Sequence, residues 1–380
     1  MAINSPLANG DAVAINADLN RVETGLLPEC LNKKFPRTVG TTINTVKTMD
    51  LPYSSIRVLQ VENPPGPALD IFLKRITIPG KEQSTIEEAL IRETCLLDKL
   101  NESLPDESVE LIASFPEQQI IATKACTGQL IDEIVNAYPF WWQPGHAHQV
   151  QRQQLARLCG DWLKRFHTLT ELENQHLKPW HDYLCGEMDW RTQVLKKEQP
   201  AHAMLYSKVA DKFYKDMNQQ AEYGPASTYH GDFAPHNIFI DQHKITVIDF
   251  FGAQQGSKLI DIINFIASIV SRAESPLYPS MRINTFCQQF IAAYALATDI
   301  QHTLVAPLLA LQSIKRLLVL QNNKTSRIDH KFAQQRSARW HRRYVENYLE
   351  GRHQLIAKGP WPFLDLSALS TGQAGKQKMS

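Results

Sequence analysis

Cysteines are few in this chain, and none of them are close neighbours. The six lie at positions 30, 95, 126, 159, 185 and 287, without a C-x-x-C pair. Disulfide-stabilised secreted domains and cysteine-zinc sites both depend on closely and regularly spaced cysteines. The pattern therefore argues against both classes and favours reduced thiols, so we expect a cytoplasmic location.

A long apolar run is also missing. No uninterrupted stretch reaches the roughly 18 residues needed to span a membrane, and Leu259 to Val270 is broken by Asp261 and Asn264. Residues 1–20 hold two aspartates and no basic residue, which argues against a secretory signal peptide. We expect neither a signal peptide nor a transmembrane segment.

An excess of charge of either sign is absent as well. Forty Lys and Arg residues face 39 Asp and Glu residues, a formal net charge of +1. This balance argues against a nucleic-acid partner and gives no support to a strongly acidic cleft for polycationic compounds. The 43% hydrophobic content provides ample core. At 380 residues the chain exceeds one average domain, so two lobes or domains are expected.

Two short apolar runs, Ile238–Ile240 and Ile245–Phe250, are separated by four polar residues, which predicts a β-hairpin. If the last residue of the first run faces the first of the second, Asn237 falls opposite the residue just before Asp249. Near neighbours across antiparallel strands lie about 5–8 Å apart. The hairpin would bring an amide oxygen and a carboxylate together, with Asp232 on the loop just before it. Such oxygen ligands suit a magnesium ion that carries nucleotide phosphates.

His230-Gly231-Asp232 through Asn237, followed by Ile248-Asp249-Phe250, resembles the H-G-D-x-x-x-x-N and I-D-[FW] pattern of the aminoglycoside phosphotransferase and choline kinase superfamily. The resemblance implies an α+β, two-lobed protein-kinase-like fold, with a small antiparallel-sheet lobe and a larger, mainly helical lobe. It also implies that Asp232 is the catalytic base, with His230 in support, and that Asn237 and Asp249 hold Mg²⁺. The alternative is a hairpin whose Asp and Asn residues only form turns.

A strand is predicted from Leu69 to Ile76, and its period of two places Lys74 on the same face as Phe72. A lysine on an apolar face needs an anionic partner, although an edge-strand lysine could also extend to water. The resemblance assigns Lys74 to the α- and β-phosphates of ATP.

A helix predicted to start near Ser84 has Glu93 in its apolar stripe, among Ile86, Leu90, Leu97 and Leu100. Burying an unpaired carboxylate in a core-facing stripe costs on the order of several kcal/mol of folding free energy. The resemblance makes Glu93 the partner that steadies Lys74. Glu88 remains a second candidate for this role, although it points away from the stripe.

The predicted organisation has four parts. Residues 1–35 form an N-terminal arm, either flexible or capping the first lobe, and residues 36–126 form the N-lobe with the nucleotide-binding sheet and helix. Residues 127–366 form the C-lobe, and 367–380 a disordered tail. Strands are expected at 41–48, 55–61, 69–76, 109–115 and 118–125, and long helices at 151–169, 283–297 and 304–320.

Two further features concern the nucleotide. Thr123 and Cys126 lie where the family's lobes join, so the resemblance implies that the backbone near them binds adenine. A Gly-rich loop of the form G-x-G-x-x-G is missing ahead of Lys74, since residues 52–73 contain only Gly66. In protein kinases such a loop covers the phosphates, and its lack leaves room for a weak or lost nucleotide site.

Asp261, twelve residues beyond Asp249, matches the place where the family carries an aspartate that braces the catalytic loop. A carboxylate near a helix start is favourable in any case, so its role could be structural alone. His167 ends a long apolar-striped helix and either supports the same loop or is an ordinary histidine. Residues 324–352 are basic and form either a solvated helix face or a dock for an anionic acceptor or an anionic membrane surface.

The sequence thus predicts an ATP- and Mg²⁺-dependent enzyme that moves the γ-phosphoryl group to a hydroxyl of a small molecule, such as a sugar, polyol, amino alcohol or related glycan. Two alternatives stay open. One is a non-catalytic kinase-like binding module, favoured by the missing Gly-rich loop. The other is a kinase that acts on a protein or a lipid-linked sugar, favoured by the basic segment.

Overall fold

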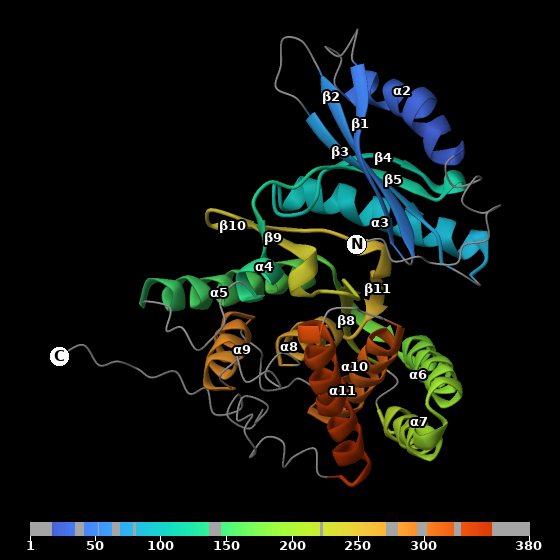
Figure 1. The fold of residues 1–380 in the computed structure, drawn as a ribbon, viewed down its shortest axis with the longest axis vertical. Helices are drawn as coiled ribbons and strands as arrows, with labels where there is room; N and C mark the ends of the chain where they lie inside the picture. Colours follow the sequence, from blue (N-terminus) through green and yellow to red (C-terminus); the bar gives the residue numbers. More distant parts are fainter. Residues whose placement is uncertain are drawn as a thin grey trace. The chain divides into compact units, whose positions relative to one another are not determined.

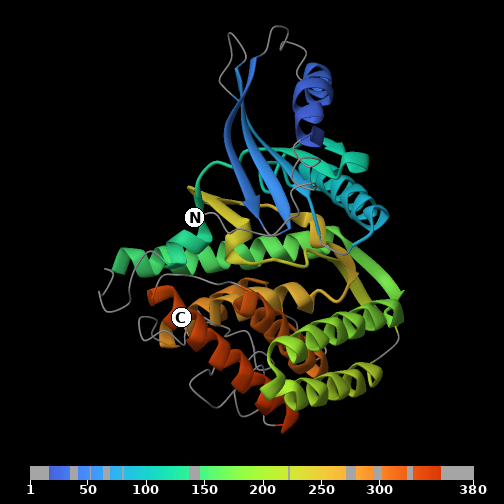
Figure 2. The ribbon, with the colours of Figure 1, turned by 45° about the vertical axis from the view of Figure 1, so that its right-hand side comes forward.

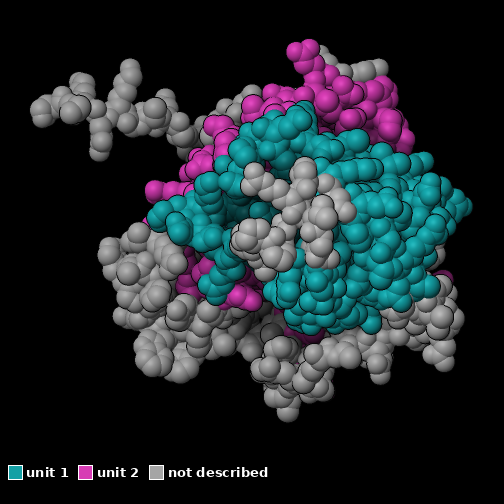
Figure 3. All heavy atoms as spheres, turned by 90° about the horizontal axis from the view of Figure 1, so that it is seen from above, with its two compact units in different colours: residues 1–129, 237–253 teal, residues 130–236, 254–380 magenta. Residues whose placement is uncertain are grey.

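The computed structural model describes residues 17–34, 42–51, 53–62, 69–78, 81–136, 146–220, 223–270, 280–294, 302–322 and 328–351. The chain divides into two compact units, coloured separately in Figure 3. Unit 1 contains residues 1–129 and 237–253, and unit 2 contains residues 130–236 and 254–380. The segment 237–253 thus groups with the first unit, whereas the sequence places it in the second lobe; the functional lobe boundaries stay a prediction.

Unit 1 is built on a five-stranded antiparallel sheet with the order β1-β2-β3-β5-β4 (Figure 1). The predicted strands are confirmed, with bounds that differ by a few residues at the ends. They are β1 (Thr42–Leu51), β2 (Ser54–Glu62), β3 (Leu69–Ile76), β4 (Leu111–Phe115) and β5 (Ile120–Lys124). A short 3₁₀ turn, η2 (Pro116–Gln118), joins the last two.

One face of this sheet is covered by the N-terminal helices, the π-helical turn η1 (Val22–Leu26) and α2 (Leu27–Lys34). Apolar side chains of these helices and of the sheet form one buried cluster, which includes Leu31 and Ile71. The buried Arg57 of β2 donates to Glu23 at 2.6 Å and fastens the helices to the sheet. Residues 17–34 therefore cap the first unit, one of the two possibilities left open by the sequence.

The predicted helix after the third strand is α3 (Gln83–Ser103). All five stripe positions, including Glu93, are buried, as the spacing of apolar residues predicts. Ile71 and Leu73 belong to the cluster beneath the N-terminal helices. Because side chains alternate along a strand, Lys74 lies on the opposite face of the sheet.

The predicted hairpin is present as β9 (Ile238–Asp241) and β10 (Lys244–Val247). Its register is confirmed, since Ile240 faces Ile245. Beyond the strand ends, the backbone N–H of Ile248 donates to the carbonyl oxygen of Asn237 at 3.0 Å. The chain then turns through the 3₁₀ segment η5 (Phe250–Gly252). Register alone therefore places Asn237 next to the residue that precedes Asp249.

Unit 2 is mainly helical (Figure 2). Helix α5 packs against α9, α6 against α7, and α10 against both α11 and α8. The helices are α4 (Ile131–Asn136), α5 (His146–Leu169), α6 (Lys178–Glu198), α7 (Ala203–Asn218), α8 (Leu259–Val270), α9 (Ser280–Tyr294), α10 (His302–Asn322) and α11 (Ile328–Leu349), with the 3₁₀ turn η3 (Pro200–His202). A short sheet accompanies them, in the order β11 (Gln254–Gly256), β8 (Tyr223–Tyr229) and β7 (Glu171–His176). The two-residue strand β6 (Gln129–Leu130) marks the passage of the chain from unit 1 to unit 2.

An aromatic cluster holds the centre of unit 2. The rings of Trp162 and Phe233 stack with centroids 5.6 Å apart, and those of Phe265 and Phe290 stack at 4.3 Å. All four side chains are fully buried. Stacked and tilted aromatic pairs of this kind contribute about 0.5–1.5 kcal/mol each beyond their area burial. The cluster gives the loop that carries Phe233 a fixed anchor.

Among the described residues one helix segment, Leu304–Gln321 of α10, is long and apolar enough to cross a membrane. Of this segment 61% is buried inside the structure. The predicted tail 367–380, the neighbourhood of Gly66, and the basic residues 324, 327 and 352 lie outside the described residues.

Candidate active site

The loop His230-Gly231-Asp232 leaves strand β8 and is followed at once by Phe233 of the aromatic cluster. Gly231 has a backbone φ of +84°, in the left-handed region that side-chain-bearing residues rarely adopt. Glycine at this position therefore lets the chain turn sharply between the strand and the anchored phenylalanine. The turn fixes the backbone on both sides of Asp232.

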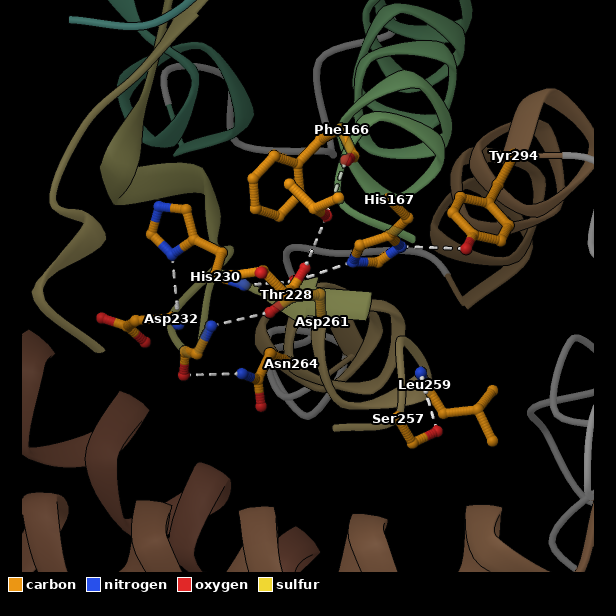
Figure 4. Close-up of polar contacts among 12 residues, drawn as sticks. Phe166, His167, Thr228, His230, Asp232, Ser257, Leu259, Asp261, Asn264 and Tyr294 are labelled. Atoms are coloured by element: carbon orange, nitrogen blue, oxygen red, sulfur yellow. Dashed lines mark hydrogen bonds and ion pairs between the residues drawn. The ribbon is translucent and has the colours of Figure 1, made fainter. Parts of the chain in front are cut away.

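Asp261, in the first turn of α8, braces this loop from behind (Figure 4). Its carboxylate accepts hydrogen bonds from the backbone N–H groups of His230 at 2.6 Å and Gly231 at 2.9 Å. Asn264, one turn later, donates to the carbonyl oxygen of Gly231 at 2.9 Å. The Asp261 side chain is completely withdrawn from solvent. The loop backbone is thus held by three side-chain hydrogen bonds from one helix.

His167, at the end of α5, completes this arrangement. Its Nε2 lies 3.1 Å from Oδ2 of Asp261, and its Nδ1 lies 2.9 Å from the hydroxyl of Tyr294. Burial lowers the pKa of His167, with Asp261 opposing the shift and Lys258 adding to it. A neutral imidazole can donate from Nε2 to the carboxylate and accept from the tyrosine hydroxyl at Nδ1. The structure therefore places His167 against the aspartate that holds the loop.

Asp232 presents its carboxylate on the side of the loop away from Asp261 (Figure 4). Its side chain is about half exposed, and each oxygen faces a basic side chain: Lys315 Nζ of α10 lies 3.8 Å from Oδ1 and His236 Nε2 lies 3.2 Å from Oδ2. Burial raises the pKa of Asp232, but the charge of Lys315 and the hydrogen bond with His236 outweigh it and keep the pKa below its usual range. The carboxylate is therefore ionised at neutral pH and reachable from outside.

Unit 1 assembles a second group of charged side chains. Lys74 Nζ donates to Asp249 Oδ1 at 2.8 Å, although 175 residues separate the two along the chain. Asp249 has a φ of +67°, a conformation that aspartate tolerates better than most residues but that still costs energy. The strained backbone directs the carboxylate to the lysine. The hairpin and the third strand of the sheet are thereby linked at this point.

Glu93 belongs to the same group. Its side chain is 5% exposed. Burial and the negative charge of Asp249 raise the pKa of Glu93 to about 8, while Lys74 and a hydrogen bond with the Phe250 backbone act in the opposite direction. The ammonium of Lys74 thus acts on two carboxyl groups. An ion pair of 2.8 Å joins Lys74 to Asp249, and the pairing of Lys74 with Glu93 stays a prediction.

Asn237 and Asp249 are the two oxygen donors at the ends of the hairpin, and both lie in unit 1. A carboxylate and an amide oxygen are the kind of donors that Mg²⁺ takes together with phosphate oxygens and water. The carboxylate of Asp249 already faces a cation, the ammonium of Lys74. Within the described ranges no three His, Cys, Asp or Glu side chains cluster as a metal site. The donor set therefore fits a metal that also binds phosphate oxygens.

The predicted lobe junction runs along β5 and past it. Thr123 is half-buried, and burial raises the pKa of the Cys126 thiol to about 11. Gly128 has a φ of +91°, and a Cβ there would lie 2.2 Å from the carbonyl oxygen of Ile240 in the hairpin. Only glycine permits this approach, which fastens the junction segment to β9 within unit 1.

Of the predicted residues, unit 1 brings together Lys74, Glu93 and Asp249 through direct contacts and charge, with Asn237 beside them in the hairpin. Unit 2 brings together His230, Asp232 and Asp261. Lys315 and His236, which face the Asp232 carboxylate, were not predicted as site residues. The mostly apolar stretch 304–320 indicates a core helix, and the Lys-Arg pair within it is the sequence feature that could have drawn attention to Lys315.

The basic segment proves to be α11. Lys331, Arg339 and Arg343 are exposed, while Arg342 donates to Gln199 at 3.4 Å. Gln199 also accepts a hydrogen bond from the hydroxyl of Tyr206 at 2.7 Å. Arg342 therefore takes part in packing between helices, and the other three basic residues form a solvated face. A role in docking stays a prediction.

Residues 131–297 match the sequence profile of the phosphotransferase enzyme family. This range includes the loop of Asp232, both hairpin donors and the bracing Asp261. No curated protein sequence matches the chain significantly.

Several solved structures are similar to this chain. The amicoumacin kinase in complex with AMP-PNP, Ca²⁺ and Ami is 13% identical, with a TM-score of 0.52 over 90% of this chain and 99% of that one. A putative aminoglycoside phosphotransferase from Ralstonia eutropha is 12% identical, with a TM-score of 0.52 over 85% and 98%. A glucosamine kinase is 14% identical, with a TM-score of 0.46 over 83% and 94%. The family match confirms the resemblance to this superfamily. The two structures with TM-scores of 0.52 confirm the two-lobed kinase-like α+β fold class.

Proposed function

We propose that this chain, whose residues 131–297 match the phosphotransferase enzyme family, is an ATP-dependent phosphotransferase with a hydroxyl group of a small molecule as its acceptor. Sugars, polyols, amino alcohols and related glycans are the candidate acceptors. The observation that carries the proposal is the loop braced by Asp261, which presents an ionised and reachable Asp232.

In the reaction the acceptor oxygen forms a bond to the γ-phosphorus of ATP while the bond from this phosphorus to the β,γ-bridging oxygen breaks. ADP leaves with the electron pair of the broken bond. Asp232 orients the hydroxyl, receives its proton and passes it to water. The low pKa of Asp232 makes it a weak base. It therefore contributes by orientation and by accepting the proton late, as suits a reaction that is mostly positioning and electrostatics.

Lys74 would bind the phosphates of ATP, and Glu93 and Asp249 would hold its ammonium in place. Asn237 and Asp249 would hold Mg²⁺, which when bound neutralises charge on the phosphate oxygens. The backbone near Thr123 and Cys126 would bind the adenine. The amicoumacin kinase complex, with its AMP-PNP and Ca²⁺, contains a nucleotide and a divalent cation of the kind proposed here. Six free thiols support a cytoplasmic location, which is also proposed.

The test is turnover of Mg-ATP by the wild type and by Asp232→Ala across sugars, polyols, amino alcohols, amino acids and antibiotics. The wild type should form ADP and a phosphorylated acceptor, and Asp232→Ala should lose about 10²–10⁴-fold in rate, the usual share of a positioned base. Asp161→Ala, at an exposed aspartate of α5, is the matched control and should keep full rate. Equal turnover by all three proteins would remove Asp232 from the reaction, and no turnover with any acceptor would favour the non-catalytic binding module.

A further inference from the structure

The side chain of Lys315 has no place in the reaction described so far, although it lies beside the proposed base. It projects from α10 between the buried Ile314 and the exposed Arg316. Its Nζ is 3.8 Å from Oδ1 of Asp232, and its side chain is 33% exposed. The ammonium therefore stands at the margin of the buried face of α10, where solvent or a bound molecule can reach it.

Stability alone does not account for this ion pair. Both partners are partly exposed, at 33% and 46% of their side-chain surface. Exposed ion pairs contribute little to folding because water and salt screen them. The ammonium of a lysine has three N–H donors, which point in three different directions. At 3.8 Å the contact with the carboxylate is longer than a hydrogen bond, so these donors can bind a molecule that approaches Asp232.

The cation beside Asp232 comes from α10. The charge of Lys315 is the largest influence that favours the ionised carboxylate. On its own loop, His236 adds a hydrogen bond to the carboxylate, while the buried His230 accepts at Nδ1 from the backbone N–H of Asp232. Asp261 is directed to the backbone N–H groups of His230 and Gly231. An acceptor that approaches Asp232 therefore meets the ammonium of Lys315 beside it.

The distance between the Lys315 ammonium and the reacting hydroxyl of the acceptor has an upper limit. An acceptor hydroxyl must come within about 2.6–3.2 Å of an Asp232 oxygen to be oriented by it. Since Lys315 Nζ lies 3.8 Å from Oδ1, the ammonium is at most about 7 Å from a hydroxyl bound to that oxygen. A carboxylate or phosphate one to three bonds from the hydroxyl can reach it, whereas an ammonium at that place is repelled.

We propose that Lys315 is a positioning and specificity-determining residue for the proposed phosphotransferase, fixing the Asp232 carboxylate and selecting acceptors that carry an anionic group close to the reacting hydroxyl. The inference rests on the proposed function and narrows its acceptor class. Lys315 exchanges no proton in the reaction. Its charge orients the base in the ion pair, and its N–H donors bind the acceptor's anionic oxygens.

The test compares acceptors that share a six-carbon chain and differ in charge: gluconate, glucitol and glucamine, with saturating Mg-ATP. If none of them is phosphorylated, the same charge series is built on the skeleton that the acceptor screen identifies. The wild type should prefer the anion over the neutral acceptor by about tenfold in kcat/KM and disfavour the cation similarly, as one well-placed charge allows. Lys315→Met should abolish this preference mainly through KM, Lys315→Arg should restore it, and Lys315→Glu should reverse it.

Two controls separate this role from a structural one. Arg316→Met removes the same charge from the adjacent exposed position and should leave the preference unchanged. In Lys315→Met the acid limb of the kcat/KM profile should move to higher pH, because only His230 and His236 then favour the ionised Asp232. Thermal unfolding should show Lys315→Met as stable as the wild type.

The outcomes are distinct. Phosphoryl transfer without a charge preference, or with a preference that Lys315→Met retains, overturns this inference and leaves the proposed function in place. Failure of the wild type to phosphorylate any acceptor in the screen overturns the proposed function, and this inference falls with it.

Discussion

Nε2 of His167 lies 3.1 Å from Oδ2 of Asp261, and the same carboxylate holds the backbone of the His230-Gly231 turn. Neither side chain is exposed by more than 3%. Helix α5, helix α8 and the loop that carries Asp232 are thus joined through one buried carboxylate, and its loss should affect folding and activity together.

Asp261→Asn should destabilise the protein by about 3 kcal/mol, the usual cost of breaking a buried charged network. The amide can accept only through its oxygen, so its NH₂ group would face N–H donors that now have no acceptor. Urea unfolding measures the effect. Asp161→Asn, at an exposed site on α5, should change the free energy of unfolding by no more than about 0.5 kcal/mol. Equal stability of the two variants would contradict the bracing role.

Acid should weaken the fold through His341. Burial lowers the pKa of His341 to about 3, and the charge of Arg316 adds to this shift. An unfolded histidine titrates at about 6.5. Below that pH the unfolded chain therefore binds a proton that the folded chain does not bind. The free energy of unfolding falls as the pH drops, with a slope of up to about 1.4 kcal/mol per pH unit.

His341→Gln should flatten this acid dependence between pH 6.5 and 4, even if the variant is less stable at neutral pH. Urea midpoints at several pH values provide the measurement. His243→Gln, at an exposed histidine of the hairpin turn, should keep the wild-type slope. The buried His167, whose pKa is also lowered, accounts for part of the slope that remains.

Rising pH should weaken the fold through Glu93, whose pKa is raised to about 8 by burial and by Asp249. An unfolded glutamate ionises near 4.3. From there up to about pH 8 the folded chain keeps a proton that the unfolded chain has lost, so this contribution to stability declines as pH rises. In metal- and nucleotide-free protein, Glu93→Gln should remove that decline, as unfolding at pH 6, 7 and 8 would reveal. A slope equal to that of the wild type would refute it.

Lys74→Met should raise KM for ATP by about tenfold or more, since an ammonium–phosphate contact is a charged hydrogen bond of about 1.5–3 kcal/mol. The fold should survive, because the Lys74–Asp249 ion pair is partly exposed. Lys47→Met, on the exposed side of the edge strand β1, is the matched control. An unchanged KM for ATP in Lys74→Met would remove Lys74 from the nucleotide site.

Two helical glycines should respond to alanine in opposite directions. A Cβ at Gly160 of α5 would lie 2.3 Å from the carbonyl oxygen of Phe290 in α9, whereas a Cβ at Gly186 of α6 meets nothing within 4 Å. Gly160→Ala should therefore cost about 1–3 kcal/mol by overpacking. Gly186→Ala should stabilise the protein by about 0.5–1 kcal/mol through helix propensity. Calorimetric melting temperatures would show both effects.

Local patterns in the sequence predict much of this structure. The hairpin register follows from two apolar runs around a four-residue turn, and the burial of Glu93 follows from the three-four spacing of its neighbours. Contacts between distant segments cannot be predicted from such local patterns. Lys315 lies beside Asp232 because of the way α10 packs within unit 2. The spacing of apolar residues in either segment does not predict this contact.

The ion pair of Lys74 is another contact between distant segments. Alternation along the strand correctly predicts the face on which Lys74 lies. Its contact with Asp249 at 2.8 Å depends on the packing of the hairpin against the sheet. The N-terminal helices escaped prediction because residues 17–34 mix polar and apolar side chains with weak periodicity, and the sheet beneath them supplies the stabilisation that the segment lacks by itself.

Those helices have a practical consequence. A truncated protein that begins at β1 would expose one apolar face of the sheet to water. Leu59, Ile71 and Leu73 would no longer be covered by Leu27 and Leu31. In a cell, proteins with such an exposed apolar face bind chaperones, are degraded by proteases or aggregate. Residues 17–34 are therefore the segment before β1 that any shortened version of this protein must keep.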